Sequence, residues 1–133
     1  EHVGSMSGAT RLERRDDMSD FILLFRSSRA ERDEAVGSPE RAQRSLEIWR
    51  NWVQDLESGG HIVDHGKPLQ PTGKVVRKAD VHDGPYVEVK DLVLGYMIVR
   101  AETIEAAITI AQSCPIVTAD GGNVEVRPTW GGM

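Results

Sequence analysis

Acidic and basic side chains gather in one short stretch of the sequence, which contains Asp83, Glu88 and Lys90. A carboxylate can act as a general base, and an ammonium group as an acid, when a cleft shifts their pKa values toward neutrality. Glu88 and Lys90 are two residues apart, so in a strand they would share one face. We therefore take the three residues as candidate catalytic groups for proton transfer or elimination.

Each of these residues also has a purely structural explanation. Asp83 precedes Gly84-Pro85, and aspartate in that position opens tight turns by hydrogen bonding to the backbone two residues on. Glu88 and Lys90 could form a solvated ion pair that contributes less than about 1 kcal/mol. The residue types alone leave the catalytic and the structural explanations open.

Four further side chains are candidates for binding a ligand: Tyr86, Trp52, His82 and Arg127. Tyr86 and Trp52 would supply apolar walls, and Arg127 lies on the polar face of an alternating strand. Trp52 lies beside the apolar stripe of its helix, whereas Trp49 lies on it. We therefore expect Trp49 in the core, whereas Trp52 could lie in the core or line a ligand pocket.

Other catalytic and metal chemistries have less support. His82 adjoins Asp83, but adjacent residues in a strand point to opposite faces, so no His–Asp dyad is expected between them. His61 and His65 lack a third ligand at zinc-site spacing, so we expect no metal and no cofactor. Cys114 is the single cysteine and lies on an apolar helix stripe, where a thiol is expected to be inert.

Length and charge limit the class of protein. The chain has 133 residues and a net charge of −5, which suits one globular domain without a basic surface for nucleic acid or anionic membranes. Residues 1–17 are polar and are expected to be a disordered leader or an expression tag, followed by one domain over residues 18–133. With no apolar run long enough for a membrane, we expect a cytoplasmic protein.

Capping residues mark two helices. Ser38-Pro39 begins the first, because serine can cap and proline at the first position loses no hydrogen bond, and Gly59-Gly60 ends it. The second begins near Thr103 and is stopped by Pro115. The expected stripes are Ala42, Leu46, Trp49, Val53 and Leu56 in the first helix, and Ile104, Ala107, Ile108, Ala111 and Cys114 in the second.

Strands are expected over residues 21–26, 74–81, 92–100 and 123–128, with a short extended piece over 61–65. A turn at residues 83–85 would join 74–81 to 92–100 as a hairpin. The order of elements predicts an α+β, ferredoxin-like β-α-β-β-α-β fold, with an antiparallel sheet and two helices on one face. We expect apolar residues on the other face, covered by a second subunit in a symmetric homodimer.

The stretch from Asp83 to Asp91 resembles the signature of the YCII-related, DGPF-domain proteins, with Tyr86 in place of the usual phenylalanine. Other pieces of the family pattern follow in order over roughly residues 20–130. Leu94 departs from the pattern, because a glycine pair is usual before Tyr96. The other matching pieces are Trp49-Arg50-Asn51-Trp52, Gly66-Lys67-Pro68-Leu69, Gly95-Tyr96, Cys114-Pro115 and the closing segment 121–128.

The resemblance implies a fold of the dimeric α/β-barrel type but no single reaction. Some relatives act on chlorinated or oxidised aromatic-ring intermediates, and a His–Asp pair is proposed as catalytic in the smaller members. Three functions follow as hypotheses. One is a cofactor-free acid/base enzyme acting on a small aromatic or cyclic acid, one is a non-catalytic small-molecule-binding subunit, and one is a dimeric assembly module.

Overall fold

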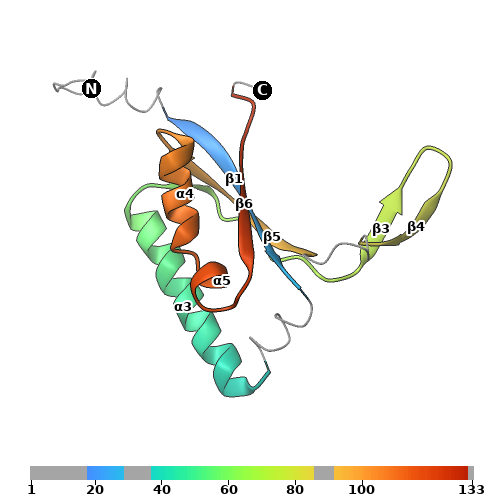
Figure 1. The fold of residues 1–133 in the computed structure, drawn as a ribbon, viewed down its shortest axis with the longest axis horizontal. Helices are drawn as coiled ribbons and strands as arrows, with labels where there is room; N and C mark the ends of the chain where they lie inside the picture. The colour runs from blue at the N-terminus through green and yellow to red at the C-terminus, as the bar shows by residue number, and fades with distance from the viewer. Residues whose placement is uncertain (1–17, 29–36, 86–91, 132–133) are drawn as a thin grey trace.

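The computed structural model describes residues 18–28, 37–85 and 92–131. The expected leader and the candidates Tyr86, Glu88 and Lys90 lie outside these ranges. The strands are β1 (Ser19–Ser27), β2 (Ile62–Asp64), β3 (Gly73–Val76), β4 (Val81–Gly84), β5 (Leu92–Ala101) and β6 (Asn123–Pro128). The helices are α3 (Pro39–Ser58), α4 (Ile104–Gln112) and α5 (Pro115–Thr118) (Figure 1).

Four strands form the main sheet in the order β2-β5-β1-β6, and each neighbouring pair is antiparallel. The helices lie on one side of this sheet (Figure 1). This arrangement confirms the expected ferredoxin-like α+β fold, with β3 and β4 inserted between two strands of the sheet. None of the helices in the described ranges is long and apolar enough to cross a membrane.

The ends of α3 form as the sequence predicts. The Ser38 hydroxyl accepts a hydrogen bond from the backbone N–H of Arg41 at 3.1 Å, which caps the first turn. At the other end Gly60 takes a positive φ of 74°, and the N–H of His61 donates to the carbonyl of Leu56 at 3.0 Å. This bond belongs to the Schellman motif that glycine favours at a helix end.

The second helix also begins and stops where expected, but its buried stripe is rotated. The hydroxyl of the N-cap Thr103 accepts from the N–H of Ala106 at 3.1 Å, and α4 ends before Pro115, which begins the additional short helix α5. Ile104 and Ile108 are exposed, although both were expected to face the core. The buried residues of α4 are Ala107, Ile110 and Ala111.

The two tryptophans of α3 differ in how deeply they are buried. Trp52 is 7% exposed, and its indole N–H donates to the Ser113 hydroxyl at 2.9 Å, so of the two places left open for it Trp52 takes the one in the core. Trp49 is only partly buried, and Leu46 is exposed. The buried face of α3 is therefore centred on Trp52 and Leu56, and it lies to one side of the predicted stripe.

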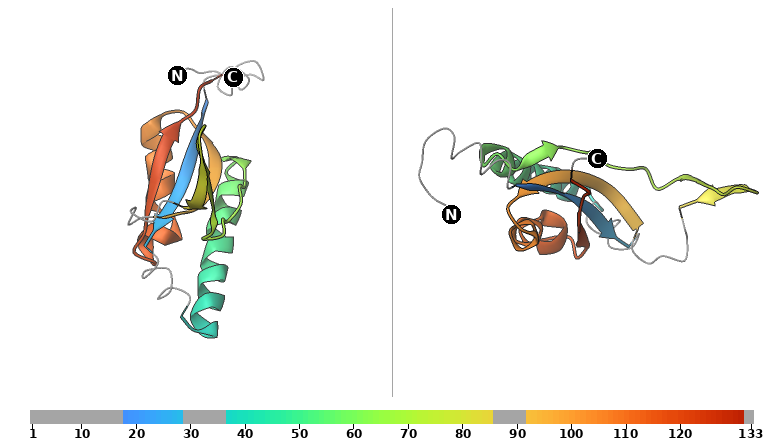
Figure 2. Two further views of the ribbon diagram at one scale, coloured as in Figure 1. Left: turned by 90° about the vertical axis from the view of Figure 1, so that its right-hand side faces the viewer. Right: turned by 90° about the horizontal axis from the view of Figure 1, so that it is seen from above.

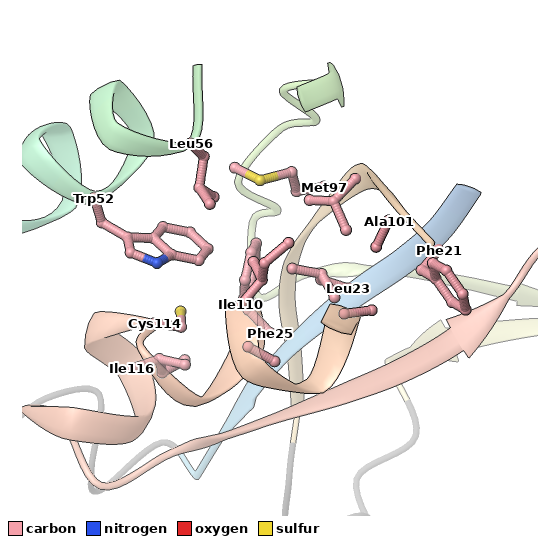
Figure 3. Close-up of a cluster of buried hydrophobic side chains, with 13 residues drawn as sticks. Phe21, Leu23, Phe25, Trp52, Leu56, Met97, Ala101, Ile110, Cys114 and Ile116 are labelled. Carbon is pink, nitrogen blue, oxygen red and sulfur yellow. The ribbon is translucent and has the colours of Figure 1, made fainter. Parts of the chain in front are cut away.

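The core lies between the helices and one face of the two central strands (Figure 3). In β1 and β5 alternate residues are buried, as the two-residue period of a strand requires. In register, Phe21 lies opposite Val99 and Leu23 opposite Met97. The side chains that complete this core include Phe25, Trp52, Leu56, Ile110, Cys114 and Ile116.

The other face of the sheet carries apolar residues, as expected. Ile22 pairs with Ile98 and Leu24 with Tyr96, and all four are half-buried. No helix in the described part of the chain covers this side (Figure 2). Ion pairs flank the apolar residues: Arg26 contacts Glu125 at 3.1 Å, and Arg100 contacts Asp20 at 3.4 Å. We call this surface the open face.

The hairpin predicted between residues 74–81 and 92–100 is wrong. Residues 73–84 form a two-stranded hairpin of their own, in which β3 pairs with β4. Its turn lies at residues 77–80, where the N–H of Arg77 donates to the carbonyl of Asp80 at 2.8 Å. Residues 92–100 pair with β1 and β2 instead. We call residues 73–84 the arm, because they project away from the sheet and helices (Figure 1).

Candidate functional site

A cavity of about 340 Å³ lies between α3 and the adjoining ends of β1 and β5. The middle of α3, the end of β1 and the first half of β5 provide most of its walls, and α5 adds one residue. Apolar side chains therefore surround the space from several elements that the fold holds together. The apolar residues that line it include Phe25, Trp49, Val53, Leu94, Met97 and Ile116.

Aromatic rings form a stiff wall on one side of this cavity. The ring centroids of Phe25 and Trp49 are 5.1 Å apart with planes at 88°, and those of Trp49 and Trp52 are 5.4 Å apart at 90°. Edge-to-face contacts of this kind are favourable beyond the area that they bury. Because Trp52 is itself fixed by Ser113, the Trp49 ring has a defined place from which to contact a ligand.

Polar groups border the cavity on its exposed side. His65, Lys67 and Asp120 line it, and His65 and Lys67 are exposed. The Nε2 of His65 lies 3.2 Å from a carboxylate oxygen of Glu57. The site thus combines an apolar interior with one ammonium group, one imidazole and one carboxylate at its rim. Among the described residues, no group of three His, Cys, Asp or Glu could hold a metal ion.

The loop over residues 66–69 packs closely on β5 beside the rim of the cavity. Gly66 has a φ of +69°, and a Cβ built on it would lie 1.7 Å from the carbonyl oxygen of Tyr96. Only glycine allows this approach. The N–H of Leu69 donates to the carbonyl of Leu94 at 2.8 Å, which fastens the loop further along β5. These contacts on either side of Lys67 fix its backbone beside the cavity.

Two pieces of the family pattern meet in this contact. Gly66-Lys67-Pro68-Leu69 and Gly95-Tyr96 are distant in the sequence, yet Pro68 forms a bridge with Gly95. A Cβ on Gly95 would lie 3.0 Å from the carbonyl oxygen of Lys67, so the backbones are nearly in contact. Leu94, where the chain departs from the family pattern, lines the cavity and packs on the core.

The sequence-based candidates on the arm lie apart from the cavity lining. Asp83 belongs to β4 and is 88% exposed, and its carboxylate pairs with the ammonium group of Lys74 on β3. Asp83 therefore lies in the paired strands of the hairpin and not in its turn, which is at residues 77–80. His82 is exposed on the opposite side of the strand, as the alternation predicts.

The remaining described candidates lie on two other parts of the fold. Trp52 lies in the core, and Arg127 is exposed on β6, opposite Ile22 of β1. The structure therefore does not gather Trp52, Arg127 and Asp83 into one site. The catalytic and ligand-binding roles given to the candidates stay predictions.

Sequence reasoning missed the cavity residues Lys67 and Asp120, and it considered His65 only as a metal ligand. A signal for Lys67 was present, since it lies in a glycine- and proline-containing piece of the family pattern. Asp120 precedes Gly121-Gly122 and had only the appearance of a turn residue. The packing of the 66–69 loop on β5 places Lys67 at the cavity, and no local pattern specifies that contact.

Cys114 behaves as an enclosed, neutral thiol. Its side chain is fully buried between α4 and α5 (Figure 3). Burial raises the pKa of the thiol from 9.0 to about 12, because the charged thiolate would lose its hydration. The reactive form of a cysteine is the thiolate, so this group is inert at neutral pH.

A comparison with family models gives one match for this chain: the YCII-related domain, over residues 24–130. A comparison with curated proteins finds no match. The matched residues run from β1 through the cavity and the arm to the residues just beyond β6. Because the match covers most of the chain, the protein belongs to the YCII-related domain family.

Proposed function

We propose that this domain binds a small, largely apolar organic acid in the cavity between α3 and β5. The observation that carries the proposal is a cavity of about 340 Å³ with apolar and aromatic walls and with the Lys67 ammonium group on its rim. Ligand sites generally have volumes of roughly 300–1,000 Å³ and a few polar groups that fix orientation. The cavity is thus large enough for a molecule with one ring or a short branched chain.

The charges at the rim support the choice of an acid. The Lys67 ammonium group can pair with a carboxylate that stays near solvent while the apolar part of the ligand enters between Trp49 and Met97. An aromatic ring inside would contact the edge or face of Trp49. Asp120 on the same rim disfavours a second negative charge, so monoacids fit the rim better than diacids.

Ligand binding is tested by thermal denaturation and by tryptophan fluorescence, because the Trp49 indole is part of the wall. The probes are benzoate and phenylacetate, with benzyl alcohol as the uncharged counterpart. A ligand at 100 times its Kd stabilises the native state by about 2.7 kcal/mol, which raises the melting temperature measurably. We expect the acids to bind more tightly than the alcohol.

Three variants locate the binding site. Val53→Phe fills the cavity and is expected to abolish binding. Lys67→Met removes the cation and is expected to weaken the binding of the acids but not that of benzyl alcohol. Asp83→Ala, on the arm, is expected to leave binding unchanged. Loss of binding in Asp83→Ala with normal binding in Val53→Phe would place the ligand at the signature and overturn the proposal.

A second candidate function is proton transfer on the bound acid without a cofactor. The Glu57–His65 pair favours it, because a carboxylate that holds an imidazole is the arrangement in which histidine acts as a general base. Exchange of the α-hydrogens of bound phenylacetate with deuterated water would report this step.

Matched variants separate the two sets of catalytic candidates. If His65 is the base, Glu57→Gln lowers the exchange rate while ligand affinity stays the same. If the signature residues Asp83, Glu88 and Lys90 supply the chemistry, Asp83→Ala lowers it instead. An absence of exchange in the wild-type protein, at saturating ligand, would leave binding without catalysis as the function.

We also propose that the protein forms a homodimer through the open face. The apolar pairs Ile22–Ile98 and Leu24–Tyr96 support it, because a second subunit would remove them from water. Leu24→Glu would place a charge in that interface. Sedimentation equilibrium should show a dimer for the wild type and a monomer for the variant, and a monomeric wild type would refute the proposal.

The proposed compartment is the cytoplasm. The single cysteine supports it, since Cys114 is a buried free thiol and needs no oxidising environment. Fractionation of cells that express the full protein tests this proposal, and recovery in a secreted or membrane fraction would contradict it.

A further inference from the structure

We propose that the arm is a clasp that packs on a second copy of this chain, with Val76 and Val81 against the partner. This inference rests on the homodimer proposed above and adds to it. The open face would supply the central contact between the two subunits. The arm of each subunit would extend beside the other and hold it from outside.

The apolar residues of the arm face water in the single chain. Val76 is 72% exposed and Val81 is 61% exposed, and the two lie directly opposite each other on β3 and β4. Lys74 and Asp83 lie two residues away on the same face and form an ion pair. One face of the arm thus presents an apolar pair beside a charged pair, a pattern suited to a protein surface.

The arm has little to stabilise it within its own subunit. Its two strands pack on each other and share no extensive contact with any other helix or strand of the described residues. A two-stranded hairpin alone is at best marginally stable in water, and packing on another surface is what usually stabilises it. The arm therefore needs a surface that its own subunit does not give.

The direction of the arm indicates where that surface lies. In Figure 1 the helices lie on one side of the sheet and the arm projects on the other. The side view in Figure 2 shows β6, β1 and β5 in front of the helices, with the arm nearer the viewer than the sheet. The arm thus rises from the open-face side. A subunit seated on the open face would lie within its reach.

Symmetry and charge both favour a second copy as the occupant. In a two-fold dimer the same surfaces meet twice, so two arms would embrace the pair reciprocally. The arm carries the basic residues Lys74, Arg77 and Lys78 and the acidic residues Asp80 and Asp83, within a chain of net charge −5. The arm is therefore a basic part of an acidic chain and is attracted to another copy of that chain.

The test is the dimer dissociation constant of Val76→Glu/Val81→Glu, measured by sedimentation equilibrium beside the wild type. Each arm would then bring two charges against the partner, and burying an unpaired charge is strongly unfavourable. We expect the Kd to rise at least about tenfold, the factor that corresponds to a modest loss of contact energy. Val117→Glu, at an exposed position of α5 on the helix side, is the matched control and should keep the wild-type Kd.

The outcomes separate this inference from the dimer itself. An unchanged Kd in the arm variant, together with dissociation by Leu24→Glu, would overturn the clasp and keep the open-face dimer. A monomeric wild type would overturn both. A rise in Kd for the arm variant with a normal Val117→Glu would support the clasp.

Hydrogen exchange gives a second measurement that needs no variant. The N–H of Arg77, which donates across the arm's turn, should exchange fast in dilute protein and slowly above the dimer Kd. The N–H of Leu69, which is bonded to β5 in the same subunit, should change much less. Equal exchange of Arg77 at all concentrations would contradict the clasp.

Discussion

We call the four-stranded sheet with its helices the body of the domain. The body and the arm both have valines in their strands, but Val99 of the body is buried and Val76 of the arm is exposed. Val99 of β5 is fully buried beneath the helices, whereas Val76 of β3 faces water. Both lie in antiparallel strands with ordinary pairing. The difference shows that a valine in a strand is buried only where another element covers it: the helices cover Val99, and no described element covers Val76.

The family pattern divides between the same two regions. The glycines at 66 and 95 bring the loop and β5 together at the cavity, so that part of the pattern maintains a shape within one subunit. Asp83-Gly84, the start of the signature, belongs to the arm. A recognised motif therefore need not lie at the cavity of the subunit that carries it.

The largest difference in the free energy of unfolding is expected between a glycine substitution in the body and one in the arm. Gly66→Ala would force a Cβ against the Tyr96 carbonyl at a positive φ, so we expect a loss of about 4 kcal/mol or more in the free energy of unfolding. Gly73→Ala on the arm has open space, and its effect should stay within about 0.5 kcal/mol. Urea denaturation measures both, and similar losses would break the comparison.

Truncation of apolar side chains should follow the same division. Leu23→Ala removes a fully buried side chain of β1 and is expected to cost roughly 2–5 kcal/mol, because a cavity remains. Val76→Ala should change stability by less than about 0.5 kcal/mol in protein dilute enough to be monomeric. A large effect of Val76→Ala under those conditions would show that the arm is stabilised within its own subunit.

The titration of Cys114 measures how tightly the body is closed. The native pKa of about 12 exceeds the ordinary value of 9.0, so the unfolded chain loses the thiol proton first as the pH rises. Stability from this group is complete below pH 9, and we expect it to fall by about 1.4 kcal/mol per pH unit above that value. Urea denaturation from pH 8 to 11 should show this slope, and Cys114→Ala should lack it.

The smallest effect is expected for the ion pair on the arm. Asp83→Asn removes the charge that pairs with Lys74, but the pair is exposed and screened by water. The change in the free energy of unfolding should lie within about 0.5 kcal/mol. A greater loss in concentrated, dimeric protein than in dilute protein would place Asp83 in contact with the partner and so sharpen the role of the arm.

Local signals predicted the elements of the body well. Ser38, Gly60, Thr103 and Pro115 act at the helix ends through contacts with residues only a few positions away. The apolar open face also followed from simple alternation in β1 and β5. These features depend on local geometry and on the period of a strand, both of which the sequence contains.

Local signals could not predict in the same way which distant segments of the chain pack or pair with each other. Val75, Val76 and Val81 suggested one strand, and Gly84-Pro85 suggested its turn, yet the chain turns earlier at residues 77–80. The rotation of α4 likewise depends on how the helix meets the sheet, so Ile104 and Ile108 were misplaced. The cavity likewise arises from contacts between distant segments, and of its rim residues His65, Lys67 and Asp120, Lys67 alone lay within a piece of the family pattern.

The edges of the main sheet have a consequence for handling this protein. The outer strand β2 has only three residues and an irregular register, and the loop at Pro68 covers the rest of β5. At the opposite edge β6 carries Glu125 and Arg127 and ends in Pro128, which has no N–H to donate. Short, irregular, charged or proline-ended edges resist the addition of foreign strands. Edge-to-edge aggregation of the native sheet should therefore be slow, even in concentrated solution.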